Sequence, residues 1–393
     1  MRTPIERSKL LDRGGEPTVR DLLSSLVFNP IDGTIRLNGD RIVMQRAIVG
    51  AELRRQLVAS LGAPEARAGQ HRQAETIMRT MFIGALCTVA MIAGVTKAAH
   101  SQDALKVAVP QRGSWDAGLP ELGKRGNIFK KHGLDLEILY TQAGPESIQA
   151  LIAGSVDIAT ASGVQAAFGT FGKGAPIRII SSEIIGSPDL YWYVPANSPI
   201  RKIEDFNGKT VAYSLTGSSS HAGLLALIAQ YKLTAKPTST GSISATLTQT
   251  MTGQVDVGFS GVPFFLDQME DGKIRIVASG NDVDTLKSRS GRVNITNVAT
   301  LQNRREALAR FHAAYKETLD WMYADPAALK IFSEFTGLPE RVVGKARELV
   351  PKAALAPDRI VGVDQIIAES VSEKFLAVPL TSQQVNDLIQ IVQ

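Results

Sequence analysis

A glycine- and hydroxyl-rich segment in the middle of the chain is the strongest candidate for binding chemistry. It reads Tyr213-Ser-Leu-Thr-Gly-Ser-Ser-Ser-His221 and joins a predicted strand to a predicted helix. Free backbone N–H groups and the positive helix end at such a junction suit an anionic group, and the serine hydroxyls add donors. A plain helix N-cap uses the same residue types, so this alternative stays open. The predicted ligand contacts here are Thr216, Gly217, Ser218 and Ser219.

A Ser-Gly dipeptide occurs twice in the same local context. Gly154-Ser-Val-Asp157 leads to Ser162-Gly163, and Gly253-Gln-Val-Asp256 leads to Ser260-Gly261. In each copy a helix ends at a glycine, a short strand follows, and the dipeptide stands at the strand's carboxyl end. Ligands of open parallel sheets bind beyond these ends, so two facing copies would line one binding region from both sides. The alternative is a pair of ordinary strand-end turns. The predicted contacts are Ser162, Gly163, Ser260 and Gly261.

Two further loops carry polar groups at predicted strand ends. Gln111-Arg112-Gly-Ser-Trp115 offers an amide, a cation and an aromatic wall, and Arg112 suits bidentate pairing with a sulfonate or carboxylate. The alternative is a solvated arginine with a packed tryptophan. Ser182 and Glu183 end another strand, where Glu183 would meet a ligand amine or else be a surface carboxylate. From these loops we include Gln111, Arg112, Trp115 and Ser182 among the predicted ligand contacts.

The sequence offers little for catalysis or metal binding. Asp157 and Asp256 invite a paired-carboxylate interpretation, but they occur one per repeat and are expected to brace the adjacent turns. His221 has no carboxylate partner within its motif. Cys87 is the single cysteine, so the chain cannot form a disulfide or a thiolate metal cluster within itself. We therefore predict a protein that is not an enzyme and has no catalytic residue, cofactor or metal.

The positive charge of the chain lies in its first hundred residues. The net charge is +5, yet residues 103–393 contain 29 basic and 29 acidic side chains. A neutral body without a Lys/Arg stripe does not have the charge distribution that nucleic-acid binding requires. We therefore expect no nucleic-acid partner.

The elements that position these loops follow an alternating pattern after residue 103. Short apolar strands alternate with helices, restart after residue 194, and give way to helices after residue 300, which predicts parallel sheets flanked by helices. The length suits two lobes plus an extension. We predict an α/β fold of two lobes joined by two crossover segments. Lobe 1 is assigned to 103–193 plus 294–393, and lobe 2 to 194–293.

An export signal is predicted at 78–101. A cationic start is followed by an uncharged run over 81–95 and then by small residues, with cleavage expected near Ser101. Fifteen helical residues rise about 22 Å, which is short of the roughly 30 Å hydrocarbon core. We therefore expect a cleaved signal peptide and a periplasmic protein.

Residues 1–77 precede this signal and are explained either by an over-extended reading frame or by a fusion. The stretch 19–67 contains Arg20-Asp-Leu-Leu-Ser-Ser-Leu-Val-Phe-Asn-Pro-Ile-Asp-Gly-Thr-Ile-Arg-Leu. It resembles the opening of the N-terminal sensory domain of aromatic-responsive, enhancer-binding activators. A strand pair around Asp32-Gly33 and Asn38-Gly39, followed by a helix over 45–61, is predicted here.

The body of the chain resembles the solute-binding proteins of ABC importers for nitrate, taurine and aliphatic sulfonates. The resemblance covers about 104–390 and is found in four segments. These segments are Phe129-Lys-Lys-His-Gly-Leu-Asp-Leu-Glu137, Gln149-Ala-Leu-Ile-Ala-Gly-Ser-Val-Asp-Ile158, Ser198-Pro-Ile-Arg-Lys-Ile-Glu-Asp-Phe-Asn-Gly-Lys-Thr-Val211 and Thr252-Gly-Gln-Val-Asp256.

That resemblance implies a type II periplasmic binding fold and capture of a small anionic, sulfonated or nitrogenous solute by hinge closure. It further implies a monomer that delivers its solute to an ABC permease in the inner membrane. One alternative is a thiamine-pyrimidine-related binding protein or enzyme, although the enzymes of that group use a Cys-rich motif absent here. The other alternative is a cytoplasmic small-molecule sensor fused to a regulator fragment.

Overall fold

The computed structural model describes residues 26–29, 34–37, 40–42 and 102–392, and the chain forms two units, Met1–Lys97 and Ala98–Gln393. In the first unit, β1 (Leu26–Asn29), β2 (Thr34–Leu37) and β3 (Asp40–Ile42) pair antiparallel in chain order. The predicted strand pair is thus confirmed and gains a third strand. The predicted helix over 45–61 and the signal over 78–101 lie outside the described residues. Within the described part, no helix combines the length and apolarity needed to cross a bilayer.

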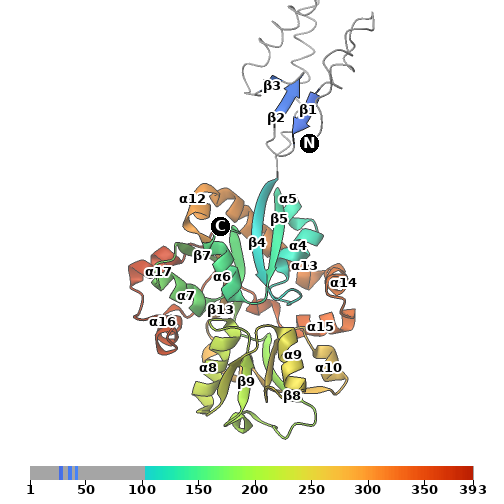
Figure 1. The fold of residues 1–393 in the computed structure, drawn as a ribbon, viewed down its shortest axis with the longest axis vertical. Helices are drawn as coiled ribbons and strands as arrows, with labels where there is room; N and C mark the ends of the chain where they lie inside the picture. The colour runs from blue at the N-terminus through green and yellow to red at the C-terminus, as the bar shows by residue number, and fades with distance from the viewer. Residues whose placement is uncertain (1–25, 30–33, 38–39, 43–101, 393) are drawn as a thin grey trace, which may run out of the picture. The chain divides into compact units, whose positions relative to one another are not determined.

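The first lobe of the second unit is built on a five-stranded sheet with the order β5-β4-β6-β13-β7 (Figure 1). Its strands are β4 (Asp103–Pro110), β5 (Leu134–Thr141), β6 (Ile158–Gly163), β7 (Ile177–Ile185) and β13 (Ser290–Asn297). Strands β4, β5 and β6 are parallel, whereas β13 runs antiparallel to both β6 and β7. The carboxyl ends of β4, β6 and β7 therefore lie at one edge, beside the beginning of β13.

Helices cover both faces of this sheet because its strands are apolar on both sides. In β4, Leu105, Val107 and Val109 contribute to one buried cluster and Ala108 to another. The first cluster is covered by α4 (Leu119–Arg125), α5 (Ile128–Lys131), α12 (Val298–Asn303), α13 (Arg305–Ala324), α14 (Pro326–Thr336) and α15 (Glu340–Leu349). The second is covered by α6 (Gly144–Ile152), α7 (Val164–Gly172), α16 (Val363–Ser372) and α17 (Ser382–Leu388).

The second lobe contains two short sheets, β10-β9 and β11-β8-β12, which a parallel bridge between Val211 and Val257 joins. The strands are β8 (Leu190–Pro195), β9 (Thr210–Tyr213), β10 (Lys236–Ser239), β11 (Gly258–Gly261) and β12 (Ile274–Ser279). The helices are α8 (Ser219–Tyr231), α9 (Ile243–Met251), α10 (Leu266–Glu270) and α11 (Asp284–Lys287). Short 3-10 turns occur at η1 (Ile203–Phe206), η2 (Gly280–Asp282) and, in lobe 1, η3 (Lys352–Ala354).

Two crossover segments, 186–189 and 280–289, connect the lobes. They touch each other: a Cβ at Gly280 would lie 2.2 Å from the Ser187 carbonyl oxygen, so only glycine fits there. The predicted change of lobe at 193/194 and 293/294 falls inside β8 and β13, because β8 belongs to the second sheet and β13 to the first. The sheets therefore place each crossing several residues earlier than the apolar pattern predicted.

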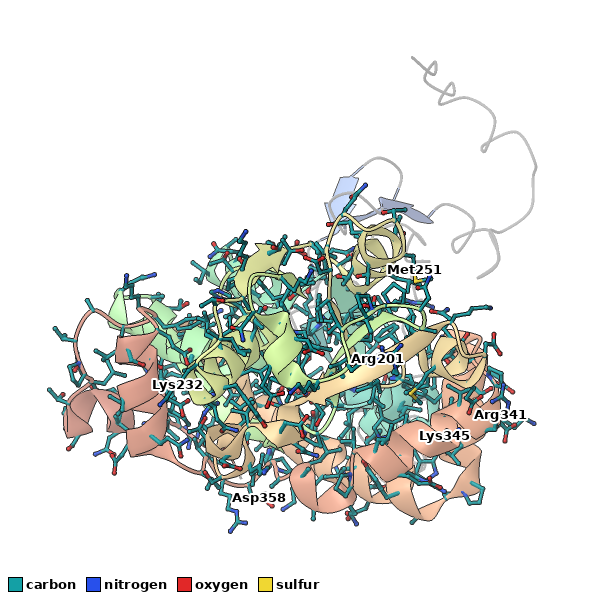
Figure 2. The ribbon with its side chains drawn as sticks, turned by 90° about the horizontal axis from the view of Figure 1, so that it is seen from below. Arg201, Lys232, Met251, Arg341, Lys345 and Asp358 are labelled. Atoms are coloured by element: carbon teal, nitrogen blue, oxygen red, sulfur yellow. The ribbon has the colours of Figure 1, made fainter. Side chains whose placement is uncertain are left out.

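The two lobes are packed against each other. One buried cluster includes Phe332 and Val343 of the first lobe together with Tyr193 and Leu266 of the second. At the surface beside it, Glu270 of α10 pairs with Arg341 and Lys345 of α15, and both cations are labelled in Figure 2. The predicted α/β architecture of two lobes is confirmed, and the described structure has the lobes in direct contact.

Candidate functional site between the lobes

A group of buried polar side chains occupies the junction of the two lobes. The group, called the interlobe cluster below, comprises Asp116, Glu183, Asp189, Ser219 and Arg292. Asp116 follows β4, Glu183 lies near the end of β7, and Arg292 lies near the beginning of β13. These three positions share one sheet edge. Asp189 comes from the first crossover and Ser219 begins α8, so the cluster joins the first lobe, the crossover and the second lobe.

Arg292 is the centre of this cluster. Its Nη2 lies 2.7 Å from Oδ2 of Asp116 and 2.8 Å from Oδ1 of Asp189, and its Nε lies 3.7 Å from Oε2 of Glu183. Its Nη1 donates to the Ser219 hydroxyl at 3.4 Å. The side chain of Arg292 is 7% exposed and that of Glu183 is fully buried. One guanidinium therefore faces three carboxyl groups away from solvent.

The interlobe cluster has more carboxyl groups than cations, and the pKa values of these carboxyl groups are shifted. Burial and the neighbouring Asp116 carboxylate raise the pKa of Glu183 well above its ordinary value. Burial raises the pKa of Asp189 too, despite its contact with Arg292. For Asp116, the Arg292 guanidinium and the hydrogen bond from Ser114 outweigh burial and hold the pKa below its ordinary value. The Arg292 guanidinium thus favours the ionised form of Asp116, whereas burial favours the protonated form of Glu183.

The amino end of α8 reaches the end of β6 in the first lobe. A Cβ at Gly163 would lie 3.2 Å from the Ser219 nitrogen, so these two backbones are in contact. Ser218 is the N-cap and accepts the His221 N–H, as the alternative interpretation of this loop expected. Among the described residues, no acceptor receives the N–H groups of Ser219 and Ser220. Two backbone donors of the helix end therefore point into the junction of the lobes.

The structure places several predicted contacts at this junction. Besides Ser219 and Gly163, a Cβ at Gly261 would lie 3.8 Å from Asp189 Oδ2. Ser162 precedes Gly163 and is fully buried, and its hydroxyl has no partner among the described residues. Ser260, next to Gly261, is also fully buried. The two Ser-Gly dipeptides thus lie at the facing ends of β6 and β11.

The Arg112 and Trp115 side chains of the predicted loop over 111–115 pack within the first lobe. Trp115 is fully buried, its Nε1 donates to Tyr323 Oη at 3.0 Å, and its ring packs edge-on against Phe332. It is a core residue of the first lobe and not an aromatic wall, because its neighbours surround it on all sides. Arg112 stacks on Phe335, with its guanidinium carbon 4.5 Å from the ring centre. Gln111 is half-buried and turns the chain with a φ of 53°.

The remaining predicted contacts have local partners. Ser182 is buried and pairs with the hydroxyl of Ser290 at 3.2 Å, away from Arg292. Thr216 and Gly217 line a small hollow between the lobes together with Pro145 and Phe375. This hollow adjoins the amino end of α8, which contributes Ser219 to the interlobe cluster.

The repeated aspartates have the structural role that the sequence indicated. Asp157 accepts the backbone N–H of Lys106 in β4 at 2.8 Å and pairs with Arg304. Asp256 accepts the backbone N–H of Thr210 in β9, also at 2.8 Å. Each carboxylate therefore fixes the turn before its strand to the neighbouring strand, and neither faces the interlobe cluster.

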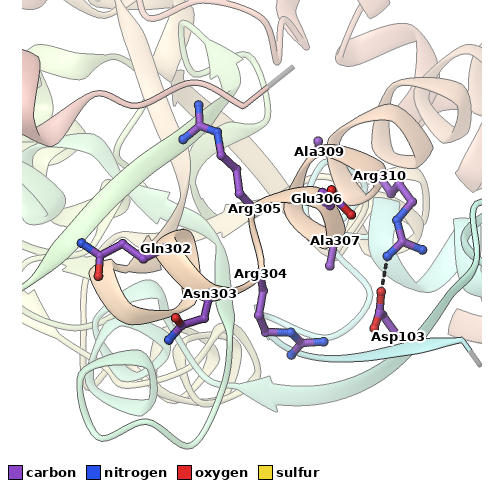
Figure 3. Close-up of a pocket in the computed structure, with 9 residues that line it drawn as sticks. All are labelled: Asp103, Gln302, Asn303, Arg304, Arg305, Glu306, Ala307, Ala309 and Arg310. Carbon is purple, nitrogen blue, oxygen red and sulfur yellow. Dashed lines mark hydrogen bonds and ion pairs between the residues drawn. The ribbon is translucent and has the colours of Figure 1, made fainter.

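A larger hollow lies at the opposite end of β4, lined by Asp103 and by residues 302–310 (Figure 3). Two of its three arginines are engaged: Arg310 pairs with Asp103, as the dashed line shows, and Arg304 pairs with Asp157. Because all its lining residues belong to the first lobe and to the amino end of the sheet, it is no place for a ligand held between two lobes.

Three residues of the interlobe cluster were missed by the sequence analysis: Asp116, Asp189 and Arg292. Arg292 lies in Ser288-Arg-Ser-Gly-Arg292, which has the composition of an exposed loop. Nothing in that local pattern indicates burial. The weak signal available was positional, because Asp116 follows the first strand and Asp189 precedes the crossover strand at the edge where ligands of such sheets bind.

This fold, with two α/β lobes joined by two crossovers, is that of solved periplasmic binding proteins. Solved structures with this fold match the chain. A periplasmic aliphatic sulphonate binding protein from Escherichia coli is 18% identical with a TM-score of 0.61, and the match covers 74% of this chain and 93% of that one. An alkanesulfonate-binding protein from Xanthomonas axonopodis, bound to MOPS, is 19% identical with a TM-score of 0.62, and the match covers 73% of this chain and 98% of that one. A periplasmic nitrate-binding protein from Synechocystis is 12% identical with a TM-score of 0.60, and the match covers 73% of this chain and 86% of that one.

A family model described as NMT1/THI5 like matches residues 122–329, and the chain belongs to that family. A putative aliphatic sulfonates-binding protein of Escherichia coli is 27% identical over 215 residues, which are 53% of this chain and 65% of that relative. The matched region thus spans about two thirds of the relative's length. The three structures and this relative are described as binding proteins. A second model, for an activator of aromatic catabolism, matches residues 21–74 and agrees with the resemblance noted for the N-terminal stretch.

Proposed function

We propose that this protein is the solute-binding component of an ABC importer and that its two lobes close over a small organic molecule. The observation that carries this proposal is the interlobe cluster. It gathers charged side chains from the first lobe and its crossover, and the helix end of the second lobe, at the facing sheet edges. Ligands of open α/β sheets bind at such edges, and closure about a crossover hinge is a common form of domain motion.

An oxyanion group, such as a sulfonate, is the proposed partner of the α8 end. The N–H groups of Ser219 and Ser220 have no acceptor among the described residues, and they begin α8, a helix of 13 residues. The Arg292 guanidinium lies within hydrogen-bond distance of the Ser219 hydroxyl. A helix end combined with a guanidinium is well suited to a sulfonate or carboxylate. The sulfonate-binding descriptions of the relatives support the same class.

A ligand titration tests the binding role. Purified protein is examined by thermal shift and then by calorimetry against aliphatic sulfonates, taurine, nitrate and aromatic carboxylates. Binding raises the melting temperature, because a ligand that binds only the folded state adds stability in proportion to ln(1 + [L]/Kd). Small-angle scattering of the same samples then measures whether the ligand compacts the chain. The absence of any binding across the panel would count against the proposal.

Export and docking complete the proposed role. The signal over 78–101 is proposed to direct the chain to the periplasm and to be removed near Ser101, and the loaded monomer is proposed to dock on an inner-membrane permease. The test is mass spectrometry of the N-terminus in separated periplasm and cytoplasm. A mature end near Gln102 in the periplasm agrees with the proposal, whereas an intact Met1 found only in the cytoplasm contradicts it.

A further inference from the structure

Two carboxyl groups of the interlobe cluster share a hydrogen bond. The side chains of Asp116 and Glu183 are bonded to each other, and they are 2% and 0% exposed. A hydrogen bond between two carboxyl groups contains a proton, because two carboxylates offer only acceptors. Burial and the Asp116 charge favour the protonated form of Glu183, so Glu183 is the donor of this bond.

The groups around this pair supply one cation for three carboxyl groups. The Arg292 guanidinium of β13 contacts Asp116 at 2.7 Å and Asp189 of the first crossover at 2.8 Å. Its Nε lies 3.7 Å from Oε2 of Glu183. Tyr315 of α13 lies near Glu183 and stays neutral, because burial raises its pKa. Among the described residues, no second cation pairs with these carboxyl groups, so a bound proton brings the cluster closer to neutrality.

The second lobe covers this cluster with uncharged groups. The Ser219 hydroxyl of α8 accepts from Nη1 of Arg292 at 3.4 Å. A Cβ at Gly163 of the first lobe would lie 3.2 Å from the Ser219 nitrogen, and a Cβ at Gly261 of β11 would lie 3.8 Å from Oδ2 of Asp189. Separation of the lobes breaks these contacts and admits water to the carboxyl groups. Water stabilises the ionised form of a carboxyl group, so an open junction favours loss of the proton.

The other glutamate whose pKa is raised differs in its position. Glu373, the C-cap of α16, accepts from Gln165 of α7 at 3.0 Å, and burial raises its pKa to about 7. Both residues belong to the first lobe, so separation of the lobes leaves their hydrogen bond intact. The Asp116–Glu183 pair lies at the junction, and its protonation therefore depends on whether the lobes are closed.

We propose that closure of the two lobes takes up a proton, which the Asp116–Glu183 pair holds for as long as the junction is shut. This inference rests on the proposed function and adds a pH dependence to it. The closed cluster binds the proton more tightly than the hydrated open cluster, so solute affinity is highest at low pH and falls as pH rises.

The pH window of this effect follows from the direction of the Glu183 shift. The fall in affinity begins above the ordinary glutamate pKa of about 4.3 and ends at the raised pKa of the closed state. Between these values Kd rises by up to about tenfold per pH unit. An anionic group at the α8 end strengthens the coupling, because it adds negative charge beside the carboxyl groups.

Calorimetry in two buffers measures the proton uptake directly. Full-length protein is titrated at pH 6.5 with ethanesulfonate, taurine, nitrate and benzoate, whose charges do not change near this pH. The buffers are cacodylate and imidazole, which differ in ionisation enthalpy and are not sulfonates. A difference in binding heat between them counts the protons that the protein takes up, and about half a proton or more per bound solute is expected. Binding without uptake overturns the inference and leaves the importer function intact. If no probe binds, the proposed function fails, and this inference fails with it.

Glu183→Gln separates the proton from the hydrogen bond, because the amide still donates to Asp116 but has no proton to release. The wild type should bind at least about tenfold more weakly at pH 8 than at pH 5, whereas Glu183→Gln should keep most of its affinity. Its proton uptake should fall below half the wild-type value, the remainder coming from Asp189, whose pKa is also raised. The control Glu373→Gln should match the wild type. Unchanged uptake in Glu183→Gln, or its loss in Glu373→Gln, overturns the inference, and the wild-type comparison of buffers decides even if Glu183→Gln does not fold.

Discussion

Two buried arginines, three positions apart, have opposite surroundings. Arg289 contacts Glu369 of α16 at 2.6 Å and donates to the Ser290 carbonyl at 3.1 Å. Arg292 faces three buried carboxyl groups at the junction of the lobes. The side chains of both arginines are under a tenth exposed. The first is a balanced pair inside one lobe, and the second is an acid-rich cluster between two.

This difference separates a structural ion pair from the proposed binding site. A buried pair whose charges balance can hold α16 against the crossover without any further partner. In an unbalanced cluster, burial raises the pKa of one carboxyl group, Glu183, and so favours its protonated form. A second carboxyl group, Glu373, lies near Arg289, but it is only partly buried and accepts from Gln165 at 3.0 Å. The carboxyl group of Glu373 is therefore partly accessible to solvent, whereas the three carboxyl groups that face Arg292 are buried.

Removing the cation of the balanced pair is expected to have the largest effect. Arg289→Met leaves the largely buried Glu369 without its cation and with only the hydrogen bond from Gln365, which should lower the free energy of unfolding by about 3 kcal/mol. Chemical denaturation monitored by circular dichroism measures the loss. The matched control is Arg201→Met, a change at an exposed arginine labelled in Figure 2, which should shift stability by no more than about 0.5 kcal/mol. Similar losses in both variants would remove the structural role assigned to Arg289.

Glu183→Gln should change how stability depends on pH. The folded-state pKa of Glu183 is raised, so its contribution is full below the ordinary glutamate pKa and is lost as pH rises towards the folded value. Between those two values the unfolded chain has released a proton that the folded chain retains. The wild type should therefore lose up to about 1.4 kcal/mol per pH unit from this group. The glutamine has no proton to release.

Urea denaturation at pH 5, 6, 7 and 8 compares the two proteins. Glu183→Gln should show a shallower fall in stability with pH than the wild type, while part of the slope remains because Asp189 shifts in the same direction. Glu121→Gln is the control, since it changes a paired carboxylate outside the cluster. An unchanged slope in Glu183→Gln would show that Glu183 is ionised in the folded protein.

More of the fold than of the candidate site could be predicted from the sequence. Apolar runs at strand spacing and glycines at helix ends are local signals, so the alternation of short strands and helices after residue 103 and the helices after residue 300 were predicted as observed. The helix over Val164–Gly172 was missed, because Ser162-Gly163 was interpreted as a turn into a loop. Arg292 could not be found, since its burial depends on carboxylates more than a hundred residues away in sequence. Trp115 was misplaced for the same reason: Phe332 and Tyr323, which enclose it, come from distant helices.

Gly163→Val tests whether closure at the junction is needed for binding. The φ of Gly163 is −56°, so a side chain is allowed by the backbone, but its Cβ would lie 3.2 Å from the Ser219 nitrogen of the other lobe. The added methyl groups should hold the lobes apart and weaken solute binding at least about tenfold, or about 1.4 kcal/mol. Each lobe should keep its secondary structure.

Calorimetry measures how tightly this variant binds the solute, and small-angle scattering measures whether the ligand compacts it. The expected result is weaker binding and no ligand-induced compaction. Gly344→Val, on α15 with no atom within 4 Å of its added Cβ, is the control and should bind and compact like the wild type. Full affinity and compaction in Gly163→Val would show that the solute does not require contact between β6 and α8.

The smallest expected effect concerns Glu373, the solvent-accessible carboxyl group near Arg289. Burial and the neighbouring Glu369 carboxylate raise the pKa of Glu373 to about 7. Its contribution to stability is therefore full below pH 4.5 and is lost as pH rises through 7. Because solvent screens part of this interaction, Glu373→Gln should remove only about 1 kcal/mol of the stability difference between pH 5 and pH 8. The measurement is urea denaturation at those two values. Glu317→Gln is the control, since the hydrogen bonds from Lys131 and His132 lower the pKa of Glu317, so its contribution to stability is constant between pH 5 and pH 8 and is lost only at lower pH. If Glu373→Gln keeps the wild-type stability difference between pH 5 and pH 8 while Glu183→Gln loses it, the pH response comes from the junction of the lobes alone. The two arginine sites then differ more strongly than their distances imply.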